Sequence, residues 1–101
     1  MIVGIAIGTE AISPVFEVSN ELLTVELKGG EELRRQTIPW RETAPLDRVD
    51  ILRRLGVETL ICGSVSLPVE LWIRSAGIKV ISRIYGPAED ALAKFKAGEL
   101  E

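Results

Sequence analysis

The sequence predicts an α/β fold in which three strands are followed by alternating helices and strands, in the order β-β-β-α-β-α-β-α. Two observations lead to this prediction. The first is that two apolar runs, residues 59–62 and 78–81, flank an amphipathic segment, which is typical of a parallel β-α-β unit with a right-handed crossover. The second is that residues 21–38 contain two strand-like runs joined by Lys28-Gly29-Gly30-Glu31, a hairpin turn.

The first half of the chain supplies three of the strands. Residues 2–7 form a continuous apolar run, as in a strand that is covered on both faces. Residues 8–16 are expected to form a loop, because a glycine, a serine and a proline interrupt any periodicity. Residues 21–27 alternate between apolar and polar side chains, and residues 32–38 return as a polar strand that suits the edge of a sheet.

Three amphipathic segments predict helices that each bury one face against the sheet. The first is capped by Thr43 and ends at Gly56, and its charged side chains, Asp47, Arg48, Asp50, Arg53 and Arg54, are expected to lie mostly away from its apolar face. The second is capped by Ser66, and the third begins at Gly86-Pro87. The side chains expected against the sheet are Leu46, Val49, Leu52 and Leu55 in the first helix, Val69, Trp72, Ile73 and Ala76 in the second, and Ala88, Ala91, Leu92 and Phe95 in the third.

These elements predict one domain, residues 1–101, built on a five-stranded mixed sheet with the strand order 3-2-1-4-5, which is the ribonuclease H-like arrangement. Strands one, three, four and five then point the same way, so four loops gather at one edge of the sheet: 8–16, 39–44, 62–66 and 82–86. Open α/β sheets bind ligands at this edge, where neighbouring strands send their connections in different directions. We therefore expect a crevice between the first and third of these loops.

The composition restricts the function. The chain has 101 residues, of which 47% are hydrophobic and 27% charged, and a net charge of −3, values typical of a soluble globular domain. This mildly acidic balance gives no electrostatic reason to bind nucleic acid, and no apolar run is long enough for a membrane span. A chain with no histidine and one cysteine has neither a Ser-His-Asp nor a Cys-His catalytic set, and it suits a reducing, cytoplasmic environment.

Cys62 is the first candidate for chemistry, because it lies where the fourth strand meets its loop. It could be a thiolate ligand for a soft metal or a metal–sulfur cluster, or a small buried hydrophobic residue that ends a strand. A phosphatase loop is excluded, because it requires an arginine six positions later, where this chain has Pro68. A two-metal nuclease is excluded as well, because the first strand carries no carboxylate.

Two aromatic segments have similar alternatives. Ser13-Pro14-Val15-Phe16 could line the crevice or simply anchor the first loop on the core. Trp40 could form a lip over the crevice, although a tryptophan beside the start of a helix is more often part of the packing.

Several segments together resemble a known family. They are residues 55–63 (LGVETLICG), residues 76–80 (AGIKV), residues 86–92 (GPAEDAL), residues 97–100 (AGEL) and the first-loop sequence Ser13-Pro14-Val15-Phe16. Their order and spacing resemble the dinitrogenase iron–molybdenum cofactor biosynthesis family, which includes NifX-like proteins and the C-terminal domain of NifB-type proteins. The resemblance spans the whole chain and agrees with the fold predicted above.

The resemblance implies a non-enzymatic carrier or chaperone for an iron–sulfur or iron–molybdenum cluster in nitrogen fixation. The positions that match the family's pocket are Ser13, Pro14, Phe16, Cys62, Gly63 and Ser64, with Cys62 as the metal ligand. Many family members have a histidine after the Ser-Pro pair, where this chain has Val15, so cluster binding here would depend on Cys62, backbone amides and a second subunit. The alternative is a diverged interaction or regulatory module without a cofactor, whose edge strand pairs with another copy in a homo-oligomer.

Overall fold

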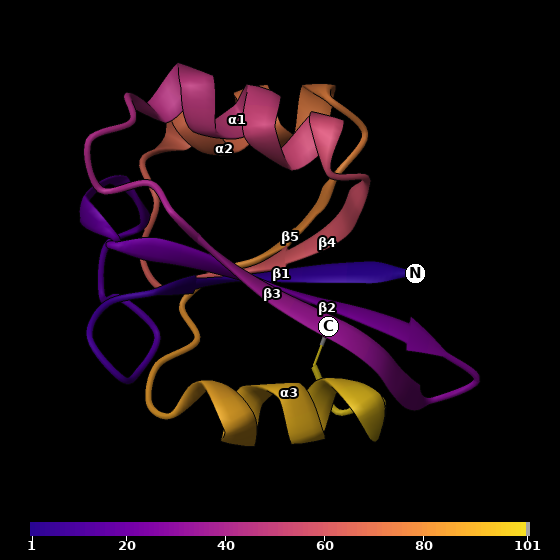
Figure 1. The fold of residues 1–101 in the computed structure, drawn as a ribbon. Helices are drawn as coiled ribbons and strands as arrows, with labels where there is room; N and C mark the ends of the chain where they lie inside the picture. The colour runs from indigo at the N-terminus through magenta and orange to yellow at the C-terminus, as the bar shows by residue number, and fades with distance from the viewer. Residues whose placement is uncertain (101) are drawn as a thin grey trace.

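The computed structural model describes residues 1–100 and shows a five-stranded mixed sheet with helices on both faces (Figure 1). The strand order β3-β2-β1-β4-β5 confirms the predicted topology. The strands are β1 (Ile2–Ile7), β2 (Glu21–Lys28), β3 (Glu31–Pro39), β4 (Val57–Ile61) and β5 (Lys79–Ile81). The helices are α1 (Pro45–Arg54), α2 (Leu67–Ser75), α3 (Ala88–Lys96) and the short 3₁₀ helix η1 (Phe16–Val18).

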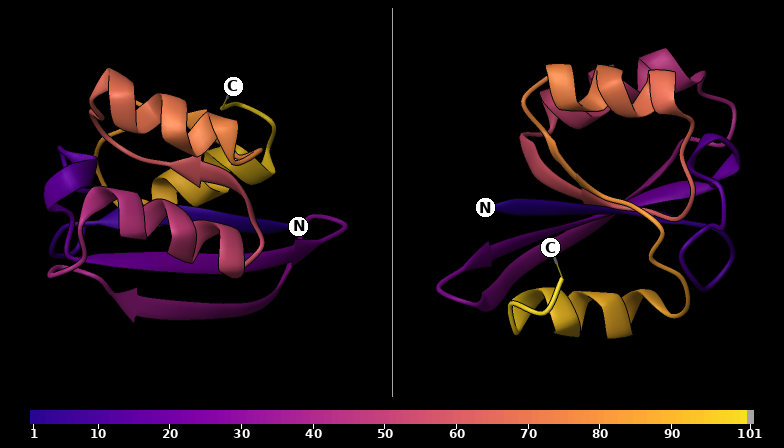
Figure 2. Two further views of the ribbon diagram at one scale, coloured as in Figure 1. Left: turned by 90° about the horizontal axis from the view of Figure 1, so that it is seen from above. Right: turned by 180° about the vertical axis from the view of Figure 1, so that it is seen from behind.

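The central strand β1 is apolar throughout because both of its faces are covered. It pairs antiparallel with β2 and parallel with β4, so that Ile5 lies opposite Leu23 on one side and Ile61 on the other. Helices α1 and α2 pack on one face of the sheet and α3 packs on the other, as the views from the front and from behind both show (Figures 1 and 2). Val3 belongs to the core beneath α3, whereas Ala6 belongs to the core beneath α1 and α2.

The edge strand β3 is polar, as predicted, and it is also irregular. Glu26 of β2 pairs with Arg34 and Leu27 pairs with Glu32, so Leu33 is an extra residue, a β-bulge, on β3. A bulge and a row of charged side chains both discourage edge-to-edge pairing with another sheet. Arg35 ties this strand to α3, because its guanidinium donates hydrogen bonds to Glu32 and Glu89.

The helices begin close to the predicted positions but with different caps. The N-cap of α1 is Ala44 rather than Thr43, with Pro45 in the first turn. Ser66 holds the N-cap position of α2, but its hydroxyl makes no capping hydrogen bond. Instead, the Glu17 carboxylate accepts a hydrogen bond from the Ser66 N–H at 2.9 Å, which connects α2 to the first loop.

The predicted inner faces of α1 and α2 were partly wrong. Leu46 and Trp72 are 58% and 45% exposed, because Val49 and Leu52 in α1 and Val69 and Ile73 in α2 already occupy the stripes that face the sheet. Arg48, one of the charged side chains expected mostly away from the apolar face, is 1% exposed and belongs to the interior. Within residues 1–100, no helix has the length and apolar character that a bilayer crossing requires.

Candidate functional site

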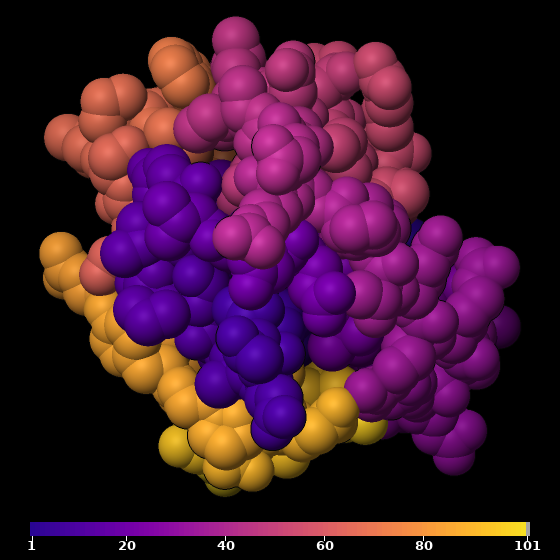
Figure 3. Space-filling view, turned by 60° about the vertical axis from the view of Figure 1, so that its left-hand side comes forward, coloured from indigo at the N-terminus to yellow at the C-terminus, as the bar shows by residue number. Residues whose placement is uncertain are grey.

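The carboxyl ends of the parallel strands meet at one end of the molecule, where the predicted loops gather. Figure 3 views this end, where the first loop, in indigo, occupies the middle of the surface. Around it lie α1 and the linker before it, in magenta, α2, in orange, and the start of α3, in yellow-orange. The first loop is therefore the element against which any ligand at this edge would bind.

The expected crevice between the first and third loops is closed, so that prediction was wrong. The Phe16 N–H donates to the Ser64 carbonyl at 2.8 Å, and the Ser64 N–H donates to the Pro14 carbonyl at 2.8 Å. Gly63 makes this approach possible, because a side chain there would collide with the Ser13 carbonyl oxygen and lie 2.6 Å from that of Pro14. The two loops pair like short strands and leave no space between them.

A cavity of about 510 Å³ lies on the other side of the first loop, between it and the fourth loop. The Ile12 N–H donates to the Gly86 carbonyl at 2.9 Å and joins the two loops at its base. On one wall, the Tyr85 hydroxyl lies 2.8 Å from the Ser64 hydroxyl, so the third loop fixes the phenol from behind. The lining residues are Gly8, Thr9, Glu10, Ala11, Ile12, Pro14, Tyr85 and Gly86.

The fourth loop carries backbone strain next to this cavity. Arg83 has a φ of +63°, the left-handed region that a residue other than glycine adopts infrequently. Its N–H donates to the Gly63 carbonyl at 2.9 Å, which helps to hold the loop in this conformation. Strained backbone of this kind is concentrated at functional sites, and Arg83 precedes Tyr85 of the cavity wall by two residues.

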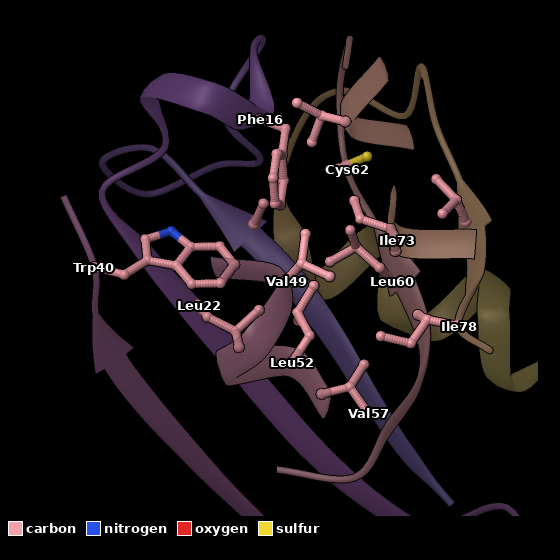
Figure 4. Packing of buried hydrophobic residues seen from close by; sticks show 13 residues of the cluster. Phe16, Leu22, Trp40, Val49, Leu52, Val57, Leu60, Cys62, Ile73 and Ile78 are labelled. Atoms are coloured by element: carbon pink, nitrogen blue, oxygen red, sulfur yellow. The ribbon is translucent and has the colours of Figure 1, made fainter. Parts of the chain in front are cut away.

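Cys62 is fully buried, with 0% of its surface exposed, on the face of the sheet that α1 and α2 cover. Figure 4 shows its sulfur among apolar side chains that include Phe16, Leu60 and Ile73. Burial raises the pKa of the Cys62 thiol to about 12, and the nearby charges of Glu70 and Glu17 add to the shift. In this conformation the thiol is protonated at neutral pH and packs as a small hydrophobic side chain.

The other predicted site residues divide into two groups. Ser13 and Phe16 lie in the interior, where the Ser13 hydroxyl donates to the Val15 carbonyl at 2.8 Å and the Phe16 ring packs edge-on against Trp40 at 5.5 Å between centroids. Pro14 is exposed and lines the cavity, and Ser64 is exposed and contacts its Tyr85 wall. Of the six predicted residues, therefore, one lines the cavity and a second contacts a residue of its wall.

A buried arginine holds the first loop from below, and its role was missed by sequence reasoning. Arg48 donates to the Phe16 carbonyl at 2.8 Å, to the Ser19 hydroxyl at 2.8 Å and to the Thr43 carbonyl at 2.8 Å. Its guanidinium carbon also lies 5.0 Å from the centre of the Trp40 ring, a cation–π contact. Burial lowers the pKa of Arg48, whereas the Glu17 carboxylate opposes this shift.

Tyr85 was also missed, although one signal could have indicated it. It is an aromatic residue in a short loop already assigned to the functional edge, and it is 55% exposed. Nothing in the sequence distinguishes Arg48 from its charged neighbours, because its partners are mainly backbone carbonyls.

The fold and the cavity define a small α/β protein of the ribonuclease H-like arrangement with a candidate binding site at the carboxyl edge of its sheet. No protein-family model matches the sequence, and no curated protein matches it. Among solved structures, the chain is similar to PH0822, with a TM-score of 0.93, 19% identity and coverage of 100% of this chain and 93% of that one.

Two further solved structures have names that refer to nitrogen fixation. A proposed dinitrogenase from Methanocaldococcus jannaschii has a TM-score of 0.79 and 25% identity, over 100% of this chain and 92% of that one. A proposed NifB protein from Thermotoga, of the DUF35 family, has a TM-score of 0.77 and 24% identity, over 99% of this chain and 90% of that one. The chain therefore shares its fold with nitrogenase-associated proteins at low sequence identity.

Proposed function

We propose that this protein is a non-enzymatic carrier or chaperone for an iron–sulfur or iron–molybdenum cluster, of the kind used in nitrogenase cofactor biosynthesis. The observation that carries the proposal is the whole-chain similarity to the dinitrogenase-related protein of Methanocaldococcus jannaschii, at 25% identity and a TM-score of 0.79. The sequence adds support, since a chain without histidine lacks the commonest general acid and base of enzymes.

The metal-ligating side chains of this chain indicate how it would hold such a cluster. Iron–sulfur clusters that reside permanently in a protein are bound by several cysteine thiolates, whereas this chain has one cysteine. Within residues 1–100 there is no group of three or more His, Cys, Asp or Glu side chains placed to hold a metal ion. The chain therefore suits transient holding of a preformed cluster that brings its own sulfide ligands, rather than permanent ligation.

The cavity beside Tyr85 is the proposed binding position. The phenol and the Thr9 hydroxyl are hydrogen-bond donors toward cluster sulfides or bound anions. Ala11, Ile12 and Pro14 of the first loop form the apolar part of the wall. Because the Ser64 hydroxyl fixes the phenol, this wall is preorganised before the cargo arrives.

Ligation by Cys62 stays a prediction and has a defined structural requirement. The thiol is buried in the apolar cluster beneath α1 and α2, in the same cluster as Phe16 of the first loop, and its pKa is raised to about 12. A metal bound to the sulfur would need the first loop to lift from Gly63 and the thiol to lose its proton. Binding in the cavity requires neither step.

The test is anaerobic reconstitution with iron, sulfide and molybdate, followed by gel filtration, visible absorption and metal analysis. A coloured product with a fixed ratio of metal to protein supports the proposal. Tyr85→Ala is expected to lower the retained metal, and Ser75→Ala, exposed on α2, is the control. Loss of colour in Cys62→Ala would identify the thiol as a ligand, whereas full retention would place the cargo in the cavity. Absence of colour in every variant would refute the carrier function.

A second candidate function is an interaction module without a cofactor, and one observation favours it. Leu67, Leu71 and Trp72 are 66%, 52% and 45% exposed on the outer side of α2. Large apolar side chains exposed together are typical of protein-binding surfaces. The module is the better interpretation if reconstitution yields no coloured product and the protein remains folded.

A further inference from the structure

A second cleft lies between the end of α1 and the overhanging strands β2 and β3, away from the loops of the candidate site. It has a volume of about 200 Å³, enough for about seven water molecules. Seen from above, β3 is the outermost strand beside α1, so the cleft opens along the edge of the sheet (Figure 2). Its apolar base includes Ile2 and Leu55, and its polar wall includes Arg34, Gln36, Arg54 and Glu26.

We infer that this cleft binds a small phosphate-type oxyanion, either inorganic phosphate or the phosphoryl group of a small molecule. Three arginines line it, Arg34 and Arg35 from β3 and Arg54 from α1. The Arg35 guanidinium is occupied by Glu32 and Glu89, so Arg34 and Arg54 are the two that remain for a ligand. One carboxylate, Glu26, lines it in the part of the chain that the structure describes. Among the lining residues the positive charges exceed the negative charge, and Asp50, outside the lining, pairs with Arg54. Planar guanidinium groups are the side chains best suited to phosphate oxygens.

Both arginines retain most of their hydrogen-bonding capacity. Arg34 is 75% exposed and pairs with Glu26 at 3.5 Å, whereas Arg54 is 76% exposed and pairs with Asp50 at 2.6 Å. A guanidinium has five N–H donors, so each keeps several for a ligand. Within residues 1–100 the Gln36 side-chain amide makes no hydrogen bond and adds two further donors.

Each arginine also has a structural reason to be where it is, but these reasons do not explain the pair. Arg54 lies in the last turn of α1, where a positive charge favours the helix dipole, and Arg53 beside it does the same. Arg34 is one of the charges that keep the edge strand from pairing. Neither role requires two arginines from separate elements to line one cleft with an apolar base.

The test is titration of the ¹⁵N-labelled protein with inorganic phosphate at low ionic strength, followed by NMR. We expect saturable shifts at residues around the cleft. Arg34→Gln and Arg54→Gln are each expected to weaken binding at least about tenfold, the effect of losing one charge-assisted interaction. Arg53→Gln is the matched control, because Arg53 precedes Arg54 in α1 and does not line the cleft. It should change the affinity less than about twofold.

A parallel titration with glycerol 3-phosphate identifies the source of the phosphate. Tighter binding than inorganic phosphate indicates a phosphorylated small molecule, and equal binding indicates the free anion. The inference is wrong if shifts do not saturate by about 10 mM, a concentration at which even a millimolar site would be mostly filled. It is also wrong if Arg53→Gln weakens binding as much as the two cleft variants. Because the readout uses no metal, it is independent of the proposed carrier function.

Discussion

Replacing Gly63 by alanine tests the central contact of the candidate site. A methyl group at this position would collide with the Ser13 carbonyl oxygen and lie 2.6 Å from the Pro14 carbonyl oxygen. These are backbone atoms, so they cannot move aside as the end of a flexible side chain would. The first loop is therefore expected to lift away from the third loop in Gly63→Ala.

The loss of stability in Gly63→Ala can be estimated from the interactions between the first and third loops. Overpacking a well-packed site costs about 1–3 kcal/mol. Two backbone hydrogen bonds, between Phe16 and Ser64 and between Ser64 and Pro14, would be stretched or lost, at about 1 kcal/mol each. Alanine restricts the unfolded chain and returns about 0.4–1 kcal/mol. The net loss in the free energy of unfolding is therefore about 2–5 kcal/mol.

Urea denaturation monitored by circular dichroism measures this loss directly. Gly8→Ala is the control, because a Cβ on Gly8 would lie 3.4 Å from its nearest neighbour, an ordinary contact, and should change the free energy of unfolding by less than about 1 kcal/mol. Gly63→Ala should also speed the reaction of Cys62 with a thiol reagent in the folded protein. Equal stability of the two variants would refute the argument that Gly63 is needed for loop contact.

Two other predictions concern the interior. Arg48→Met is expected to lower the free energy of unfolding by at least about 2 kcal/mol, because the carbonyls of Phe16 and Thr43 lose their hydrogen-bond donor. The control is Arg53→Met, on the exposed side of α1, which should change the free energy of unfolding by less than about 0.5 kcal/mol. Urea denaturation measures both. Burial raises the pKa of the Cys62 thiol from 9.0 to about 12, so the folded protein keeps a proton that the unfolded chain loses. Stability should therefore fall between pH 9 and pH 12, by up to about 1.4 kcal/mol per pH unit, and less steeply in Cys62→Ala.

The topology could be predicted because it depends on periodicity, which the sequence displays. Residues 2–7 are apolar without alternation because the β1 strand lies between two helical layers, and residues 32–38 are polar because β3 is an edge. The hairpin follows from Gly29 and Gly30, both of which have positive φ in the structure. The apolar run, the polar run and the glycine pair are local patterns, so they can be interpreted without knowing the contacts of the rest of the chain.

The site could not be predicted to the same degree because its contacts are between backbones distant in sequence. The approach of Gly63 to Ser13 and Pro14 involves carbonyl oxygens, which every residue has, so no residue type reveals it. Arg48 is buried for the same reason, since its main partners are the carbonyls of Phe16 and Thr43. Sequence reasoning expected a crevice between the first and third loops, which the structure shows closed, whereas the cavity at this edge lies between the first and fourth loops.

The position of the first loop explains both why the first and third loops are in contact and why a cavity lies beside Tyr85. It also allows an experiment to distinguish cargo bound to Cys62 from cargo bound in the cavity. The first loop is anchored on the third by the amides of Phe16 and Ser64 and from below by Arg48. This places the Phe16 side chain in the cluster that buries Cys62 and leaves open the space beside Tyr85. A cargo bound to the thiol would break the two amide hydrogen bonds, whereas a cargo in the cavity would leave them intact. Hydrogen exchange of those amides should therefore be unchanged or slower in the reconstituted protein. Faster exchange on loading would show that the loop opens and that the buried thiol is the ligand.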